Sequence, residues 1–558
     1  MSDYEVVIMA DLVITLSIVF VTAGVLLLVG NQLGFPVVPG YIIAGLIAGQ
    51  FVAEEALIEL ALWGVAFLVF AFGIRVDLGD LQSVLRDGEG AAATQLAVVA
   101  PLALAVGYGL GGLFGFEEQL RNAIYFGAAA TLSSTLVGGR VRQEEIQSNI
   151  VYRRLASTVH FFDDIVAIGA LLVLSAEVLT DVQLVTSNLG FGVIFVLAGL
   201  LIYRHGFPLL LRAAGKDVEL VLMGSISILI GFLAAAELAG ISIVIGAFAA
   251  GLAIRKEGAD TLGVRNGIES ITDFFAAIFF VTVGALVAVP TVEVLVLASV
   301  LIMLVVVLNP LIHTLAFIYE GYDGRTAFLA GFSLNQVSEL ALVVAIQAWL
   351  LGTVAEAVFD AIILAAAVTM IFAAFSGRYE NRIYESLLRP LLESRTGYID
   401  RQSNVTEGIS EHIIVLGYGR QGRRIVEKLE ELDCTYVVVE NDPAKRDDLQ
   451  THCNNYVFGD ALADYPMEVA RLTDAQLVVS TIDYRPVSES LLEREFAGDL
   501  ILRSDSSREA SEYLDAGATF VAVPDILASD QLVENVERVI GDETGRYDLE
   551  TNTWTKAH

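Results

Sequence analysis

The first 376 residues form a series of apolar blocks separated by short polar loops. Each block is about 20 residues long, which is enough for an α-helix to cross about 30 Å of hydrocarbon. The expected fold is therefore a polytopic α-helical membrane domain over residues 1–376. About thirteen spans are predicted, at residues 6–29, 36–52, 55–74, 91–114, 122–139, 152–178, 185–203, 218–236, 239–254, 270–289, 291–317, 326–350 and 354–376.

After Phe375 the pattern changes to short β-branched runs alternating with amphipathic helices. We expect a charged linker at 377–408, a soluble α/β domain at 409–541 and a polar tail at 542–558. In the α/β domain, a strand at 412–416 is followed by a helix that ends near 432 and a strand at 436–440. This order is typical of a Rossmann-like domain with a parallel sheet.

Loop charges predict the orientation, because basic residues concentrate on the cytoplasmic side of a membrane. An extracellular N-terminus and a cytoplasmic soluble domain fit the charges, and the acidic start, Met1 to Glu5, favours a retained first helix over a cleaved signal. The basic residues fall in every second loop: Arg86; Arg140, Arg142, Arg153 and Arg154; Arg204, Arg212 and Lys216; Arg255, Lys256 and Arg265; Arg325; Arg378 and Arg382.

The mean hydropathy of +0.66 supports the membrane assignment, while the net charge of −33 adds a separate expectation. There are 66 acidic residues against 33 basic ones, of which only five are Lys. Such a surface stays hydrated at high ionic strength, which favours a salt-loving host, and it argues against nucleic acid as a partner. Cys434 and Cys453 both lie in the soluble part, where neither a disulfide nor a metal site is expected.

Asp163 and Asp164 lie side by side within the predicted span 152–178. A carboxylate at this depth costs about 2.5–3.5 kcal/mol or more, so the pair is the first candidate for an ion and proton site. The alternative is that one aspartate pairs with a buried base or caps a helix break. Arg153 and Arg154 are more than about two helical turns away, which disfavours that alternative.

Two other predicted spans contain polar interruptions, and they have opposite orientations across the membrane. Inverted repeats with discontinuous helices produce this arrangement, with the half-helix ends meeting near the midplane to hold an ion. Alternatively, the Ser and Thr side chains bond to their own helix backbone. The candidate ion-binding side chains in these interruptions are Thr131, Ser133, Ser134 and Thr135, and then Asn335, Gln336 and Glu339.

A nucleotide site is predicted where Gly417, Gly419 and Gly422 form a GxGxxG motif between a strand and a helix. The glycines let a diphosphate approach the helix N-terminus, and Glu440, at the end of the next strand, accepts hydrogen bonds from ribose hydroxyls. The alternative is a Rossmann-like scaffold whose site has decayed. Further candidates are Arg420 and Arg503 for phosphate and Asp442, Asp460 and Asp483 at the cleft edge, although Arg420 and Asp442 also suit a solvated surface.

These motifs resemble those of Kef-type potassium/proton antiporters. Residues 131–168, TLSSTLVGGRVRQEEIQSNIVYRRLASTVHFFDDIVAI, are similar to the LSST-to-FQDI stretch of that family. The family's GAFLAG, FFISVGM and GQGSEFAFV elements resemble residues 241–254, 274–287 and 333–344, in the same order. The soluble part resembles the family's cytosolic RCK (TrkA-N) domain, and Gly459-Asp460-Ala461 stands where those domains carry GDA.

The resemblance implies a homodimer of NhaA-like fold, with a dimerisation scaffold and a moving core that carries two crossed, broken helices. It implies that Asp164 binds proton and cation alternately. Asp163 stands where Kef proteins have Gln and sodium/proton relatives have Asp or Asn, so the choice between Na⁺ and K⁺ stays open, and Asn309 stands at the position of a family lysine. A regulatory adenine nucleotide, NAD(H) or AMP, and a halophilic archaeal source are also expected.

The sequence also bears on two other classes of function. A membrane-anchored NAD-dependent oxidoreductase is disfavoured because the chain after Asp483 offers no evident hydride-acceptor site. An RCK-gated potassium channel needs a carbonyl filter on a re-entrant loop, whereas the filter-like VTVGALV at 281–287 lies inside a continuous apolar span. The intramembrane aspartate pair favours an antiporter over both.

Overall fold

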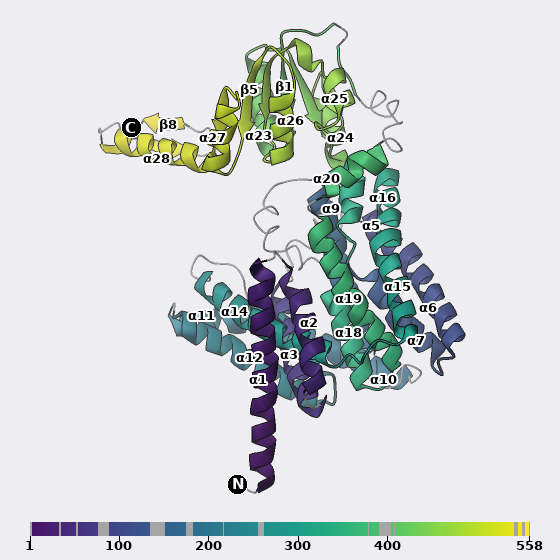
Figure 1. Cartoon of the computed structure of the whole chain (residues 1–558). Helices are drawn as coiled ribbons and strands as arrows, with labels where there is room; N and C mark the ends of the chain where they lie inside the picture. The colour runs from purple at the N-terminus through teal and green to yellow at the C-terminus, as the bar shows by residue number, and fades with distance from the viewer. Residues whose placement is uncertain are drawn as a thin grey trace. The chain divides into compact units, whose positions relative to one another are not determined.

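The structure is a computed structural model, and its secondary structure falls into an all-helical part and an α/β part (Figure 1). It describes residues 3–32, 35–51, 54–75, 89–133, 151–174, 182–215, 217–254, 262–377, 379–389, 403–406, 408–540, 545–548 and 553–556.

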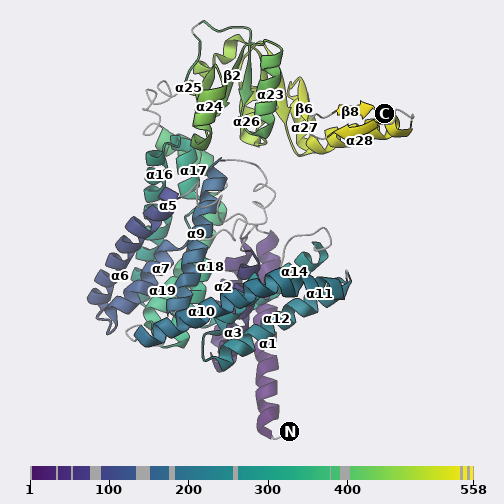
Figure 2. The same ribbon diagram turned by 180° about the vertical axis from the view of Figure 1, so that it is seen from behind.

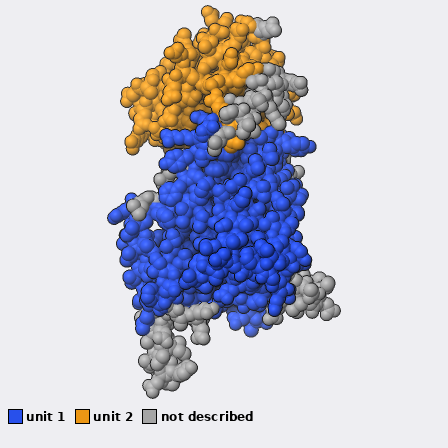
Figure 3. Space-filling model, turned by 45° about the vertical axis from the view of Figure 1, so that its right-hand side comes forward, with its two compact units in different colours: residues 1–142, 154–320, 327–386 blue, residues 143–153, 321–326, 387–558 orange. Residues whose placement is uncertain are grey.

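The chain divides into two compact units, coloured separately in Figure 3. The first, helical unit comprises residues 1–142, 154–320 and 327–386, and the second comprises residues 143–153, 321–326 and 387–558. Two helices, α9 (Val151–Leu174) and α17 (Gly324–Phe332), have their first three residues in the second unit and continue in the first.

One group of helices in the first unit packs through small residues. A methyl group on Gly45 would overlap the carbonyl oxygen of Val281, and one on Gly284 would overlap that of Ile42. Gly73 and Gly251 meet in the same way, so backbones are in direct contact. The group consists of α1 (Asp3–Gln32), α2 (Val37–Ala48), η1 (Gly49–Phe51), α3 (Glu54–Arg75), α10 (Val182–Leu201), η4 (Ile202–Gly206), α11 (Phe207–Ala214), α12 (Val218–Leu238), α13 (Ile243–Leu252) and α14 (Leu262–Ala285).

A second group of helices, several of which are labelled in Figure 2, contains the polar interruptions. Its long helices are apolar, as lipid and neighbouring helices require. The helix that follows the second interruption is capped by Ser338, whose hydroxyl accepts from the backbone N–H of Leu340. The group comprises α5 (Glu89–Thr94), η2 (Gln95–Val99), α6 (Ala100–Phe114), α7 (Gln119–Thr131), α9, α15 (Val292–Met303), η6 (Leu304–Leu308), α16 (Asn309–Glu320), α17, α18 (Glu339–Leu350) and α19 (Glu356–Ser376).

Helices occur within each of the thirteen spans that the sequence predicts, although the number of membrane crossings itself stays a prediction. Among the described residues, five helices are long and apolar enough to cross a bilayer: Gln95–Phe114, Gly190–Ala214, Val218–Leu238, Val292–Glu320 and Glu356–Ser376. Two short helical segments, α20 (Glu380–Ile383) and η7 (Tyr384–Leu388), follow in the predicted linker.

The second unit contains a six-stranded parallel sheet with the order β3-β2-β1-β4-β5-β6, as a Rossmann-like fold requires. The strands are β1 (His412–Leu416), β2 (Tyr436–Glu440), β3 (Tyr456–Phe458), β4 (Ala475–Ser480), β5 (Asp499–Arg503) and β6 (Phe520–Ala522). All residues of β1 and β2 are buried, because both faces of the sheet are covered. The predicted strands at 412–416 and 436–440 are therefore confirmed.

The crossovers are helical. They are α23 (Arg420–Glu431), η9 (Pro443–Lys445), α24 (Arg446–His452), α25 (Asp464–Val469), η10 (Leu472–Asp474), α26 (Arg485–Glu493) and α27 (Ser507–Asp515), and α28 (Pro524–Ile540) follows the sheet. In the predicted polar tail, β7 (Gly545–Asp548) pairs antiparallel with β8 (Thr553–Lys556).

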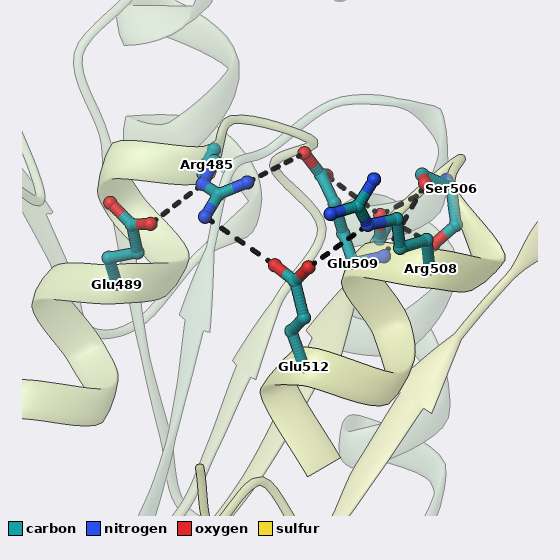
Figure 4. Close-up of polar contacts among 7 residues, drawn as sticks. Arg485, Glu489, Ser506, Arg508, Glu509 and Glu512 are labelled. Atoms are coloured by element: carbon teal, nitrogen blue, oxygen red, sulfur yellow. Dashed lines mark hydrogen bonds and ion pairs between the residues drawn. The ribbon is translucent and has the colours of Figure 1, made fainter. Parts of the chain in front are cut away.

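The acidic surface of this unit includes a shared ion pair between two helices (Figure 4). Arg485, at the start of α26, bridges Glu489 on its own helix and Glu509 and Glu512 on α27. These side chains are about a third to a half exposed, so the network stabilises the unit little and is screened by salt.

Candidate ion site and nucleotide pocket

The two polar interruptions meet in the first unit. Helix α7 ends at Thr131, and the next residue, Leu132, is extended. Ser133 then forms an antiparallel bridge with Val337, and the backbone N–H of Ser338 donates to the carbonyl of Leu132 at 3.0 Å. Since 337 and 338 lie between α17 and α18, the two interrupted segments cross in extended conformation.

Asp163 of α9 lies at this crossing and is 1% exposed. Its Oδ2 accepts from the Ser133 hydroxyl at 2.6 Å and from the Ser133 backbone N–H at 3.0 Å. The Nε2 of Gln95 donates to both carboxylate oxygens, at 3.1 and 3.3 Å. These are donors that a buried carboxylate needs in place of water.

Asp164, the next residue on α9, is only half-buried. Consecutive helical residues point about 100° apart, so the two carboxylates lie on different faces of α9. Asp163 is thus held by protein donors at the crossing, while Asp164 is the more accessible of the two.

The remaining predicted ion-site residues divide into three sets. Thr131 donates to the carbonyl of Gly127 in its own helix, which is the alternative that the sequence left open. Asn335, Gln336 and Glu339 are buried in and beside the α17–α18 break, and Asn335 Nδ2 lies 3.5 Å from Ser376 Oγ. Ser134 and Thr135 lie outside the described residues.

Asn309 and Gln95 occupy similar local structures. Gln95 opens the π-helical turn η2, and Asn309 directly follows the π-helical turn η6. Both side chains are buried, and the amide oxygen of each has no hydrogen-bond partner among the described residues. Single π-helical turns within α-helices are frequent at functional sites.

Sequence reasoning missed Gln95 and His160. His160 lies one turn before Asp163 on α9, and its Nδ1 is 3.1 Å from the Ser133 hydroxyl. A polar Gln in the apolar run 91–114 was the available signal for Gln95, as was an intramembrane His for His160. Together the crossing offers carboxylate, hydroxyl and amide oxygens, which are ligands suited to an alkali cation.

The second site is a cavity of about 300 Å³ in the second unit, at the carboxyl ends of the parallel strands. Open α/β sheets bind ligands in this position. The predicted residues Gly417, Gly419, Arg420, Glu440, Asp460, Asp483 and Arg503 all line it. Residues 151–152 and 325–326, which sequence reasoning did not assign to the site, line it as well.

The glycine loop has the geometry that the motif predicts. Gly417 has a φ of 88°, a conformation that favours glycine, and it leads from β1 towards α23. Gly422 does not line the cavity, but a methyl group there would overlap the carbonyl oxygen of Gly417. The close contact between Gly422 and Gly417 therefore packs the N-terminus of α23 against the glycine loop.

Glu440 is already saturated with donors. Its Oε2 accepts from the backbone N–H of Tyr418 and from Lys445 Nζ, and its Oε1 accepts from the backbone N–H groups of Asn441 and Asp442. A carboxylate has about four acceptor positions, so a ribose hydroxyl at Glu440 has to displace a donor, and Lys445 supplies the one side-chain donor among these four.

Asp442 corrects one expectation. It was expected to suit either the cleft edge or a solvated surface, but it is 1% exposed and does not line the cavity. Its Oδ1 accepts from the backbone N–H of Ala444, which closes the turn after β2. Arg420, in contrast, is exposed and lines the cavity.

The cavity lining carries an excess of positive charge in a strongly acidic protein. Four cationic side chains, Arg325, Arg420, Lys445 and Arg503, face three carboxylates, Glu440, Asp460 and Asp483. Burial and the nearby Asp505 raise the pKa of Asp483 to about 6, although Arg503 opposes this shift. The lining therefore favours an anionic ligand.

Comparisons with known proteins agree with this arrangement. Residues 16–378 match the family described as sodium/hydrogen exchanger, transmembrane. This chain belongs to the sodium/hydrogen exchanger family. The exchanger also carries a TrkA-N domain, matched at residues 413–524. It is thus a cation/proton antiporter with a cytosolic gating domain, and not an enzyme.

Similar proteins share both parts. The exchanger is 28% identical to the Escherichia coli (strain K12) protein YbaL, named as a cation/proton antiporter, over 83% of this chain and 85% of YbaL. It is 26% identical to the glutathione-regulated potassium-efflux system protein KefC of Salmonella schwarzengrund, over 83% of this chain and 74% of KefC.

A solved sodium/proton antiporter, MjNhaP1 of Methanocaldococcus jannaschii, matches 68% of this exchanger with 14% identity and a TM-score of 0.49, and 99% of MjNhaP1 is covered.

Among the described residues of the exchanger, no group of three or more His, Cys, Asp or Glu side chains is arranged to hold a metal ion in the manner of a structural metal site.

Proposed function

We propose that the exchanger moves K⁺ or Na⁺ against H⁺ by alternating access, with proton and cation competing for Asp164 beside Asp163. The observation that carries this proposal is the position of Asp163 at the crossing of the two interrupted segments, next to Asp164 on α9. A desolvated carboxylate takes up a proton, and an alkali cation favours the ionised form and displaces that proton. Competition for one carboxylate enforces exchange.

The contacts of the two aspartates suggest different roles. Asp163 is held by Ser133 and Gln95, so it fixes the crossing, while the more accessible Asp164 binds the transported ions. The family resemblance places Asn309 at the position of a family lysine, so that position offers Asp163 no cationic partner. We expect one cation per proton, and protonation of Asp163 would add a second proton.

The test is reconstitution of the whole protein in liposomes, with internal pH followed after K⁺ or Na⁺ is added outside. Proton movement that depends on one cation and is lost in Asp164→Asn supports the proposal and names the ion. Exchange that persists in Asp164→Asn removes Asp164 as the binding residue. Current under a pure proton gradient distinguishes electroneutral from electrogenic exchange.

The gating domain binds an adenine nucleotide, AMP or NAD(H), in the 300 Å³ cavity. Support comes from the glycine loop at the N-terminus of α23 and from the cationic excess of the lining. Nucleotide changes transport only through different affinities for the transporter's two states. Calorimetric titration of the full-length protein with AMP and with NAD tests this, and heat from neither would contradict it.

The proposed arrangement in the cell is a homodimer in the plasma membrane, with the N-terminus outside and the gating domain in the cytoplasm. Alternating loop charges support the orientation. The proposed domains are the membrane domain at residues 1–376, the linker at 377–408, the nucleotide-binding domain at 409–541 and the polar tail at 542–558. Cross-linking of a single cysteine in α1 and accessibility of an N-terminal tag to membrane-impermeant reagents test the dimer and the orientation.

A further inference from the structure

The carboxylate of Glu440 is used by the fold itself at the carboxyl ends of β1 and β2. Its Oε2 accepts from the backbone N–H of Tyr418 at 2.7 Å and from Lys445 Nζ at 2.9 Å. Its Oε1 accepts from the backbone N–H groups of Asn441 and Asp442, both at 3.0 Å. Each oxygen therefore has two donors, and Glu440 is only 5% exposed. This carboxylate fixes the glycine loop to the turn after β2.

The place of Glu440 is the place of the ribose in a Rossmann-like domain. When such a domain binds an unphosphorylated ribose, the acid that follows the second strand accepts a hydrogen bond from the 2′-hydroxyl. Three of the four donors to Glu440 are backbone groups of the fold, and the fourth is Lys445. A 2′-hydroxyl thus finds no vacant acceptor position on this acid, although the acid stands where the motif predicts it.

Lys445 supplies the polar group that a ligand can use at the same place. It lines the cavity, its side chain is 21% exposed, and its backbone N–H donates to the carbonyl of Asp442 at 3.0 Å. An ammonium has three N–H donors, so the bond to Glu440 leaves two for a ligand. Because Lys445 neutralises Glu440, an anionic group that approaches the ammonium meets a donor without an uncompensated negative charge.

We propose that Lys445 binds a phosphate on the ribose 2′-position, and that the cavity prefers nucleotides with this phosphate, such as NADP(H), to those with a free 2′-hydroxyl. The proposal rests on the proposed nucleotide binding and extends its ligand class: AMP and NAD(H) bind, and their 2′-phosphorylated counterparts bind more tightly. A 2′-phosphate accepts charge-assisted hydrogen bonds from Lys445 without displacing any donor of Glu440. Glu440 positions the ammonium in place of binding the ribose.

The experiment uses three probes in calorimetric titrations of the full-length protein in detergent: AMP, adenosine 2′,5′-bisphosphate and adenosine 3′,5′-bisphosphate. The two bisphosphates carry the same charge, so a difference between them reports the position of the second phosphate. Lys445→Gln removes the cation, Lys445→Arg keeps it, and Lys428→Gln is the matched control. Lys428 pairs with Glu431 in the same unit, but these side chains are 65% and 67% exposed. Size-exclusion profiles and melting temperatures verify that each variant is folded.

We expect the wild type to bind the 2′,5′-bisphosphate about five-fold or more tighter than either other probe, since a hydrogen bond to a charged group is worth more than a neutral one. Lys445→Gln should reduce both preferences to about two-fold or less, and Lys445→Arg and Lys428→Gln should keep them. Equal binding of the two bisphosphates by the wild type overturns the proposal, because charge alone then attracts them. A preference that persists in Lys445→Gln overturns it too.

NADP and NAD repeat the comparison with complete dinucleotides. The wild type should prefer NADP, and Lys445→Gln should lose most of this preference. Equal wild-type affinity for NADP and NAD contradicts the role of Lys445, although the nucleotide site itself then stands. A wild type that binds none of the five probes removes the nucleotide site as well.

Discussion

Ser133 donates to the same carboxylate oxygen of Asp163 twice, through its hydroxyl at 2.6 Å and its backbone N–H at 3.0 Å. Both donors belong to Ser133, which lies in a chain segment that is extended because α7 ends at Thr131. The contact therefore couples the side chain of α9 to the helix break itself, and it separates the roles of the two adjacent aspartates.

The first prediction follows from this separation. In Asp163→Asn, the amide oxygen can still accept from Ser133, so cation-driven proton movement should persist with a loss of about ten-fold or less. In Asp164→Asn it should disappear, because no titratable group remains at the more accessible position. Fluorescence of an internal pH dye in liposomes measures both, and the reverse order of effects would exchange the assigned roles.

Gln95 supports a second prediction. Its amide donates to both oxygens of Asp163, and a hydrogen bond to a charged group contributes about 1.5–3 kcal/mol. Gln95→Leu keeps a similar volume but removes the donor, so the exchange rate should fall by up to about ten-fold, as in Asp163→Asn, and its pH profile should shift. The exposed Leu96→Ala on the same turn is the control and should leave both unchanged.

A third prediction concerns the glycine loop. Gly422→Ala introduces a methyl group against the carbonyl oxygen of Gly417, so α23 has to move away from the loop. Affinity for AMP should fall by about ten-fold or more, while Glu427→Ala, at an exposed position of the same helix, should have no effect. Normal AMP binding by Gly422→Ala would show that the helix N-terminus does not hold the phosphate.

The fourth prediction is a pH dependence of stability. Burial, and then the charge of Asp460, raise the pKa of Asp323 from its usual value near 4 to about 6, against opposing hydrogen bonds from Thr326 and the charge of Arg325. The folded protein then binds this proton more tightly than the unfolded chain does. Stability should accordingly fall as pH rises from about 4 to 6 and level off above that.

Asp323→Asn keeps an oxygen that can cap α17 but does not titrate. Its melting temperature should fall less than that of the wild type between pH 4 and 7. Asp483, whose pKa is also raised to about 6, contributes with the same sign, so the slope should shrink and not vanish. An identical slope in the variant would mean that Asp323 does not titrate in this range.

Much of this could be predicted from the sequence, because the signals are local. Runs of apolar residues define helices, and the glycine motif with Glu440 defines a strand-turn-helix-strand unit that the structure confirms. The polar interruptions at 131–135 and 333–339 predicted broken helices, and the bridge between Ser133 and Val337 lies there. In each case neighbouring residues carry the whole pattern.

The remainder depends on contacts between distant residues. Nothing near Gln95 in the chain indicates that it meets Asp163, 68 positions later. The sequence identifies Arg325 only as a basic loop residue, because its partner, Asp460, is 135 positions away. The charged side chain of Asp442 predicted a position at the cleft edge or on the solvated surface, but Asp442 is buried in the turn after β2. Such pairings are set by packing and not by local propensity.

The glycine contacts of the first unit limit how the protein can move. Where Gly45 meets α14 and Gly73 meets α13, backbone rests on backbone, with no side chains between them to change rotamer. Sliding one of these helices by a fraction of a turn would drive a carbonyl into its neighbour. Helices α2, α3, α13 and α14 should therefore stay fixed relative to one another during the transport cycle. The movement that opens the ion site to either side then has to occur in the other group of helices, which would move as a rigid body relative to these four.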